Sequence, residues 1–199
     1  EAIGKLLDDT GFAFLFAPRL HPAMRAVMPV RRSLGVRTLF NVLGPLANPA
    51  GVTRQVVGVF SRDAQALVAG ALAELGAEHA WVVHGEDGLD ELSVCAPTAV
   101  VEVRDGRVAR SFTVEPASLG LPPASRDGLA GGDAGTNAVR IGAILRGEEG
   151  GAAGAAVALN AAAALHVAGS AASLEEGLEA AKRALGEGRA WEKLADVVA

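Results

Sequence analysis

The fold is decided by residues 54–83, RQVVGVFSRDAQALVAGALAELGAEHAWVV, where two short apolar runs flank a longer amphipathic one. Residues 54–60 and 79–83 are rich in valine and largely apolar, which is typical of buried strands. Between them, residues 62–75 place apolar side chains on one helical face, and Gly76 follows as a stop signal. A strand–helix–strand unit predicts two parallel strands joined by a right-handed crossover.

The remainder of the chain adds a hairpin and a run of helices. Residues 99–104 and 107–114 flank Asp105-Gly106, the dipeptide that most strongly indicates a two-residue hairpin turn. Helical patterns follow over residues 136–145, 152–167, 174–185 and 191–198. We therefore expect residues 1–199 to form a single α/β domain, with a mixed, mostly parallel central sheet wrapped by helices.

Size and charge narrow the class of protein. The chain has 199 residues, and 18 Lys and Arg against 23 Asp and Glu give a net charge of −5. Hydrophobic residues make up 50% of the sequence and charged residues 21%, which excludes a disordered tail protein. An acidic chain is also a poor nucleic-acid binder, because phosphate contacts need clustered Lys and Arg.

Membrane, secretion and disulfide signals are weak. The most apolar stretch, residues 152–168, contains Gly154, Asn160 and His166, so we interpret it as a buried helix of a soluble protein. No signal peptide is visible, which makes the cytoplasm the expected location. A single cysteine, Cys95, excludes an internal disulfide and a cysteine-only metal cluster. Four scattered histidines, at positions 21, 79, 84 and 166, argue against a zinc site.

An acidic loop, His84–Ser93 (HGEDGLDELS), follows the second buried strand. In open α/β sheets, ligands bind beyond the carboxyl ends of the strands, which is where this loop falls. Asp90 and Glu91 are adjacent, so both can face one oxygen-preferring cation such as Mg²⁺. The alternative is a solvated acidic turn in which Asp serves as a cap. His84 is a candidate for a structural hydrogen bonder and equally for a catalyst.

Two further segments carry weaker signals. Residues 24–41 contain Arg25, Arg31, Arg32 and Arg37, and a guanidinium suits a carboxylate or phosphate, although such arginines can also lie on the surface. Residues 131–137, GGDAGTN, precede a helix, where a glycine-rich turn can bind phosphate or simply cap the helix. No Lys follows as in a Walker A loop, so the pattern favours capping.

Longer strings in the sequence are similar to those of a known family. They are FAPRLHPAMRAV (16–27), VRRSLGVRTLFNVLGPLANPA (30–50), HGEDGLDELS (84–93), GGDAGTNA (131–138) and VALNAAAALHVAG (157–169). In this order they resemble the anthranilate phosphoribosyltransferases, which belong to the nucleoside phosphorylase and phosphoribosyltransferase family. The resemblance covers essentially the whole chain, and the strings between residues 16 and 50 are its most specific part.

The resemblance implies a reaction and a set of site residues. It implies transfer of the 5-phosphoribosyl group from phosphoribosyl pyrophosphate (PRPP) to the amine of anthranilate, in tryptophan biosynthesis, with Mg²⁺ as cofactor. It places Arg31 at the anthranilate carboxylate and Asp90 and Glu91 at Mg²⁺. The segment that contacts anthranilate would include Ala17, Pro18, His21 and Met24. A homodimer without nucleic-acid or membrane partners is implied as well.

One departure and two alternatives accompany this interpretation. The glycine-rich GTGGD pyrophosphate loop and the small N-terminal helical domain of the family have no counterpart in residues 1–199, so we expect the chain to be the larger part of the catalytic domain and inactive alone. A pyrimidine nucleoside phosphorylase would share the acidic loop but would not explain the strings before residue 50. A non-enzymatic nucleic-acid-binding paralogue would need a basic groove, which a net charge of −5 disfavours.

Overall fold

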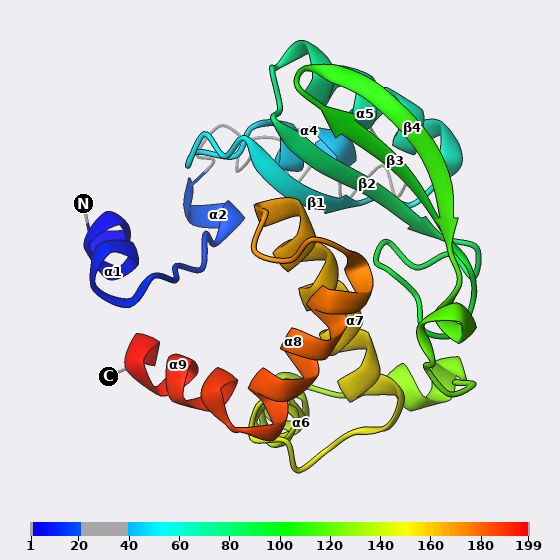
Figure 1. Ribbon diagram of the computed structural model, residues 1–199. Helices are drawn as coiled ribbons and strands as arrows, with labels where there is room; N and C mark the ends of the chain where they lie inside the picture. The colour runs from blue at the N-terminus through cyan, green and yellow to red at the C-terminus, as the bar shows by residue number, and fades with distance from the viewer. Residues whose placement is uncertain (1, 21–39, 199) are drawn as a thin grey trace. The chain divides into compact units, whose positions relative to one another are not determined.

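The computed structural model describes residues 2–20 and 40–198, and the chain forms two compact units. One unit comprises residues 52–191, and the other comprises residues 1–51 together with 192–199. The larger unit contains the sheet and most of the helices (Figure 1). It therefore holds the acidic loop.

The sheet of the larger unit has four strands in the order β1-β2-β3-β4. They are β1 (Arg54–Gly58), β2 (His79–Gly85), β3 (Thr98–Arg104) and β4 (Arg107–Val114). Strands β1 and β2 are parallel, which confirms the strand–helix–strand prediction. The β2–β3 and β3–β4 pairings are antiparallel, so the expectation of a mostly parallel sheet is wrong for the described strands. The irregular loop at residues 86–97 and the two-residue turn at Asp105-Gly106 take the place of helical crossovers, which explains the difference.

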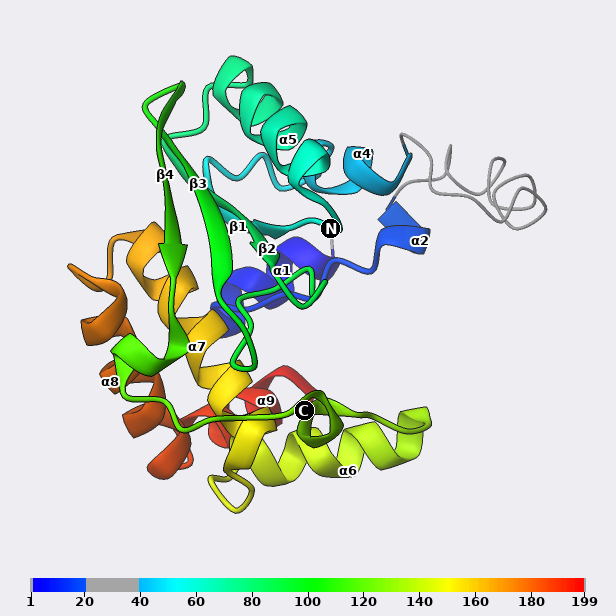
Figure 2. The ribbon, with the colours of Figure 1, turned by 90° about the vertical axis from the view of Figure 1, so that its right-hand side faces the viewer.

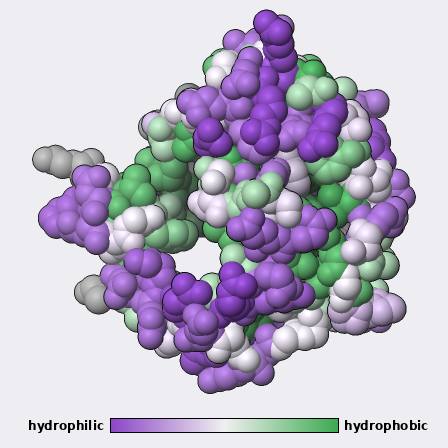
Figure 3. All heavy atoms as spheres, viewed as in Figure 1, coloured by the Kyte–Doolittle hydropathy of each residue, from purple (hydrophilic) through white to green (hydrophobic). Residues whose placement is uncertain are grey.

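The hairpin between β3 and β4 forms where Asp105-Gly106 predicts it. Asp105 has φ 48° and Gly106 has φ 70°, the left-handed values that a two-residue turn of this type requires. The β4 strand is largely exposed along its length. In the space-filling view, hydrophilic side chains cover much of this part of the surface, with apolar ones between them (Figure 3).

Helices cover both faces of the sheet (Figure 2). Helix α5 (Arg62–Glu74) begins at Ser61, whose side chain accepts a hydrogen bond from the Ala64 N–H. Its buried Gln65 donates to the backbone carbonyls of Val82 and Ala99, which ties the helix to β2 and β3. Because side chains alternate along a strand, Trp81 and Val83 of β2 point the other way, into the main core with α7 and α8.

Helix α7 (Gly151–Ala168) is the central helix of this core. Among the described residues, one helix is apolar and long enough to cross a membrane by these two criteria, and it is α7. Leu159, Ala162 and Ala163 are nevertheless fully buried within the unit, which confirms the predicted core helix. Helix α8 (Leu174–Gly186) packs closely on it, since a Cβ added to Gly177 would lie 2.6 Å from the Ala162 carbonyl oxygen.

The other elements of this unit frame the core. They are η1 (Pro116–Leu119), η2 (Arg126–Leu129), α6 (Ala134–Leu145) and the start of α9 (Arg189–Val198). Asp133 caps α6 by accepting from the Thr136 N–H at 2.8 Å, and hydrogen bonds to this backbone keep the pKa of Asp133 below its usual value. The glycine-rich turn at residues 131–137 therefore has the capping role that its sequence favours.

The smaller unit contains short helices. They are α1 (Ala2–Thr10), α2 (Ala17–Leu20) and α4 (Phe40–Leu46). Residues 11–16, whose sequence allowed a strand or a loop, form neither a helix nor a strand. Within this unit, Lys193 Nζ donates to the Thr10 carbonyl at 2.9 Å, which fixes the C-terminal part of α9 against the end of α1.

Candidate functional site

The predicted acidic pair lies in the loop that follows the carboxyl end of β2. The Asp90 and Glu91 side chains are both exposed. Within the described part of the chain, neither carboxylate takes part in a hydrogen bond or an ion pair, whereas Glu86 in the same loop pairs with Arg62 at 3.2 Å. Two adjacent, uncommitted carboxylates are the donors that Mg²⁺ binds together with substrate phosphates. The residues present therefore fit this cation.

A close backbone contact places Asp90 beside the end of β1. Gly58 is the last residue of β1, and a Cβ added there would lie 1.4 Å from the Asp90 carbonyl oxygen. Only glycine can occupy this position, because the Cβ of any other residue would overlap the Asp90 backbone. The absence of a side chain at Gly58 thus lets the acidic loop lie directly against the carboxyl end of the neighbouring parallel strand.

Hydrogen bonds within the loop fix its path. The Gly85 N–H donates to the Leu89 carbonyl at 2.8 Å, and the Gly88 N–H donates back to the Gly85 carbonyl at 2.8 Å. Ser93 Oγ donates to Asp87 Oδ2 at 2.8 Å. Asp87 therefore stabilises the turn, which is the capping role that the sequence allowed for an aspartate. Asp90 and Glu91 remain available as cation ligands.

Asn160 of α7 holds the backbone directly after the acidic pair. Its Oδ1 accepts from the Leu92 N–H at 2.9 Å, and its Nδ2 donates to the Leu92 carbonyl at 3.0 Å. Leu92 is 1% exposed, so water cannot replace these bonds. Sequence reasoning assigned Asn160 no role, and the signal for it was a polar amide in an otherwise apolar helix.

His84 has the structural role that its sequence left open. The ring is half-buried, and Nδ1 lies 2.9 Å from the Val59 carbonyl oxygen. This contact joins the end of β2 to the residue after β1. It identifies His84 as a brace of the loop.

The predicted anthranilate segment is only partly described. Arg31, His21 and Met24 lie outside the described residues, as do Arg25, Arg32 and Arg37. Ala17 and Pro18 open helix α2 in the smaller unit. The assignment of these residues to anthranilate therefore stays a prediction.

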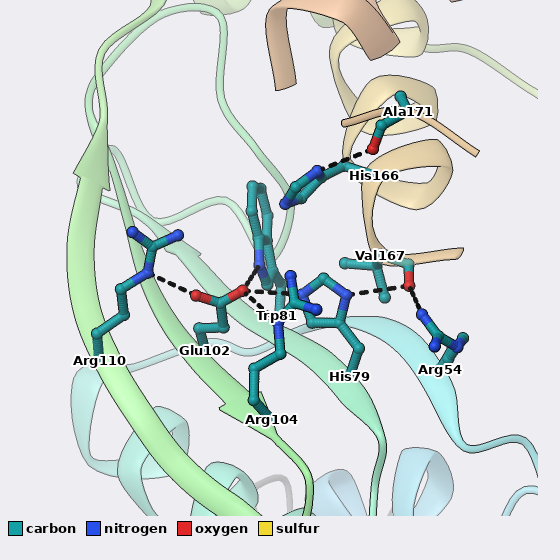
Figure 4. Close-up of polar contacts among 9 residues, drawn as sticks. All are labelled: Arg54, His79, Trp81, Glu102, Arg104, Arg110, His166, Val167 and Ala171. Carbon is teal, nitrogen blue, oxygen red and sulfur yellow. Dashed lines mark hydrogen bonds and ion pairs between the residues drawn. The ribbon is translucent and has the colours of Figure 1, made fainter. Parts of the chain in front are cut away.

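A second polar cluster, missed by sequence reasoning, surrounds Glu102 on β3 (Figure 4). The Oε2 atom of Glu102 accepts from Arg110 Nε at 2.5 Å. Its Oε1 atom accepts from Trp81 Nε1 at 3.3 Å and from Arg104 Nε at 3.1 Å. The His79 ring lies 2.9 Å from the same oxygen. The strand register brings these side chains together, because Glu102 pairs with Trp81 on β2 and with Arg110 on β4.

The cluster shifts the pKa values of its buried members. Burial raises the pKa of Glu102, but the donors from Arg110, Trp81, Arg104 and His79 outweigh it and bring the pKa down to about 2. Burial is the main reason that the pKa of His79 lies below its usual value. Glu102 is therefore a charged, hydrogen-bonded carboxylate inside the sheet layer at neutral pH.

The site and fold together define the class of protein. Residues 1–191 match the family model described as "Glycosyl transferase family, a/b domain", and the chain belongs to this family. Within it, the chain is 51% identical over 199 residues to the anthranilate phosphoribosyltransferase of Anaeromyxobacter dehalogenans, and 47% identical to that of Rhodopseudomonas palustris. All of this chain aligns, against 58% of either relative, so the chain spans less than two thirds of the length of the curated relatives it matches.

Solved structures give the same result. The anthranilate phosphoribosyltransferase of Thermus thermophilus superposes with a TM-score of 0.88 at 44% identity, over 100% of this chain and 60% of that one. The Saccharomyces cerevisiae protein, solved in complex with PRPP and Mg, superposes with a TM-score of 0.88 at 29% identity, over 98% of this chain and 56% of that one. The resemblance drawn from the sequence strings is confirmed across the whole chain.

Proposed function

We propose that the chain is the α/β part of an enzyme that transfers the 5-phosphoribosyl group of PRPP to anthranilate and releases pyrophosphate. The single observation that carries the proposal is the uncommitted pair Asp90 and Glu91, held at the carboxyl ends of two parallel strands. The relatives support the choice of substrates, because the yeast protein is solved with PRPP and Mg and also with 4-fluoroanthranilate.

The chemistry asks the protein for positioning and charge compensation. As pyrophosphate leaves the ribose, negative charge develops on the leaving group, and Mg²⁺ held by Asp90 and Glu91 would offset it. The aromatic amine of anthranilate is already unprotonated near neutral pH, so it can attack without prior deprotonation. We assign no side chain to accept the proton that the amine loses as the N–C bond forms. The braces at Gly58, Asp87 and Asn160 keep the two carboxylates in place before the substrate arrives.

Arg31 is the residue that we propose for the anthranilate carboxylate, with Ala17, Pro18, His21 and Met24 in the same segment. The support is the match of the strings around residues 16–50 to the family. Replacing Arg31 with Ala should raise the KM for anthranilate more than it lowers kcat. An unchanged KM would remove Arg31 from the binding site.

The proposal is tested with the complete gene product that contains this chain, because the relatives are longer than it. The assay follows anthranilate fluorescence in the presence of PRPP and Mg²⁺. Loss of signal that requires all three components is the expected result. A flat trace from the folded protein would overturn the proposal, and nucleoside phosphorolysis would then be measured.

The acidic pair has a matched control in its own loop. Asp90→Asn combined with Glu91→Gln should weaken the Mg²⁺ dependence and slow turnover by about two orders of magnitude or more. Glu86→Gln removes another exposed carboxylate, directly after the end of β2, and should leave the Mg²⁺ titration unchanged. Equal effects of the two variants would show that general loop charge, rather than the pair, binds the cation.

The oligomeric state and the cellular location are also part of this proposal. We propose a homodimer in the cytoplasm, on the strength of the family resemblance alone. Sedimentation equilibrium of the complete gene product tests the homodimer, and cell fractionation tests the location.

A further inference from the structure

Two histidines far apart in the sequence meet beside Glu102 (Figure 4). His79 begins β2 and His166 lies near the end of α7. One ring nitrogen of each histidine and one oxygen of Glu102 all lie within 4.8 Å of one another. His79 and Glu102 are almost fully buried, at 1% and 3% exposed. The scattered positions that argue against a zinc site in the sequence are thus brought together by the fold.

Each histidine is oriented through its Nδ1 atom by a backbone carbonyl. His79 Nδ1 lies 3.1 Å from the Val167 oxygen, and His166 Nδ1 lies 3.2 Å from the Ala171 oxygen. A carbonyl oxygen only accepts hydrogen bonds, so a proton on Nδ1 satisfies each contact and leaves Nε2 with a lone pair, although His79 Nε2 also faces a second acceptor, Glu102. Histidines that bind metals through Nε2 are characteristically held by this kind of outer contact.

The His79 ring faces two hydrogen-bond acceptors, whereas its neutral form carries one N–H. Its Nδ1 faces the Val167 carbonyl, and its Nε2 faces Glu102 Oε1 at 2.9 Å. A neutral imidazole carries one N–H and can donate to only one of these oxygens. A positive species between Nε2 and Oε1, either a second proton or a metal ion, would satisfy the Nε2 lone pair and join the donors that Oε1 already has in Trp81 and Arg104.

We propose that His79, Glu102 and His166 bind one divalent cation of the zinc class. Two imidazole nitrogens and one carboxylate oxygen form a ligand set of four-coordinate zinc, with the fourth position left for water. Imidazole ligands favour Zn²⁺ over Mg²⁺, so the site differs in chemistry from the acidic loop. The proposal does not depend on the proposed function.

The surroundings of the cluster suit such an ion. Glu102 would bind it through Oε1, while Oε2 stays hydrogen-bonded to Arg110, as ligating carboxylates usually are. A cavity of about 370 Å³, lined by Trp81, His166 and Glu175 among others, lies beside the cluster and reaches one of its three proposed ligands, His166. At Oε1 the ion must compete with the Trp81 N–H, at 3.3 Å, and with Arg104, whose side chain is 45% exposed and can turn into solvent.

The position of the cluster gives the ion a structural role. It lies at the first residue of β2, whereas the acidic loop follows the seventh, about 20 Å further along an extended strand. A bound ion would link β2, β3 and α7 at the end of the sheet remote from the acidic pair. We expect it to stabilise the larger unit without contacting the transferred group.

The first experiment titrates zinc into the full chain after chelator treatment, by calorimetry in excess Mg²⁺ at a pH slightly above neutral. One equivalent should bind, and His166→Gln should weaken that binding by more than about tenfold. His84→Gln is the matched control, because His84 is also half-buried and bonded to a carbonyl through Nδ1 but lies outside the cluster. Circular dichroism confirms that each variant is folded.

A second measurement needs no variant. Co²⁺ added to the unaltered chain should give the visible bands of a tetrahedral nitrogen and oxygen site, and one equivalent of zinc should remove them. Absence of stoichiometric zinc binding would mean that a proton fills the position, which overturns the proposal. Binding that survives His166→Gln but disappears in Asp90→Asn with Glu91→Gln would assign the ion to the acidic loop and overturn it as well.

Discussion

Replacing Asn160 with Ala should destabilise the protein and disturb the acidic pair together. The substitution removes the acceptor of the Leu92 N–H and the donor to the Leu92 carbonyl, and both groups are buried with a residue that is 1% exposed. An unsatisfied buried polar group costs about 1–3 kcal/mol, and partial relaxation of the loop offsets some of the sum. We therefore expect the free energy of unfolding to fall by about 2–4 kcal/mol.

The chain contains the same two-bond amide contact in an exposed setting, which provides the control. Asn137 Oδ1 accepts from the Gly132 N–H at 2.8 Å, and its Nδ2 donates to the Gly132 carbonyl at 3.1 Å. Water can replace these bonds, so Asn137→Ala should cost less than about 1 kcal/mol. Urea unfolding at equilibrium measures both variants, and equal losses would refute the argument that burial makes the Asn160 contact strong.

A third variant separates the two hydrogen bonds. Asn160→Asp keeps the oxygen that accepts from Leu92 but replaces the donor with a second oxygen facing the Leu92 carbonyl. It should therefore destabilise the protein at least as much as Asn160→Ala in spite of its nearly identical shape. In the complete enzyme, both variants should raise the Mg²⁺ concentration needed for half-maximal activity, because Leu92 directly follows Glu91.

Three other perturbations follow from the same structure. Gly58→Ala should lower the free energy of unfolding by more than about 3 kcal/mol, because its Cβ would overlap the Asp90 carbonyl. Gly70→Ala lies inside α5, where its Cβ meets nothing within 4 Å, and it should raise that free energy by about 0.5–1 kcal/mol. Thermal unfolding compares the two variants. Ser61→Ala removes the cap of α5 and should cost about 1 kcal/mol in the same assay. Folding lowers the pKa of Glu102 from 4.5 to about 2, so its charged form stabilises the folded protein by about 3 kcal/mol. This stabilisation is complete above pH 4.5 and is lost as the pH falls toward 2. Acid unfolding of the metal-free protein should show this loss, and Glu102→Gln should remove that dependence.

Local patterns predicted much of the fold. The valine-rich runs, the helical face between them and Asp105-Gly106 each indicate an element by chemistry contained within a few residues, and each element forms where it is expected. The direction of β3 relative to β2 was not contained in such a pattern. The apolar run at residues 99–104 reads equally as a parallel or an antiparallel strand, and its pairing depends on how the acidic loop turns the chain back.

The candidate site was predictable only in part for the same reason. Asp90 and Glu91 follow a recognisable strand, so their position at the edge of the sheet could be inferred from the sequence. The clamp by Asn160 and the meeting of His79 with His166 depend on where α7 packs, which involves residues far away in the chain. A lone histidine on a helix carries no local sign of its partner.

The contact between α7 and α8 limits how this sequence can change over evolutionary time. Gly177 meets the Ala162 backbone so closely that even a methyl group would force the two helices apart. The many alanines of α7 are then a requirement of close helix packing, and the same helix carries Asn160 and His166. Substitutions to larger apolar residues along this contact should therefore be rare among functional variants, since they would displace the groups that hold the acidic loop.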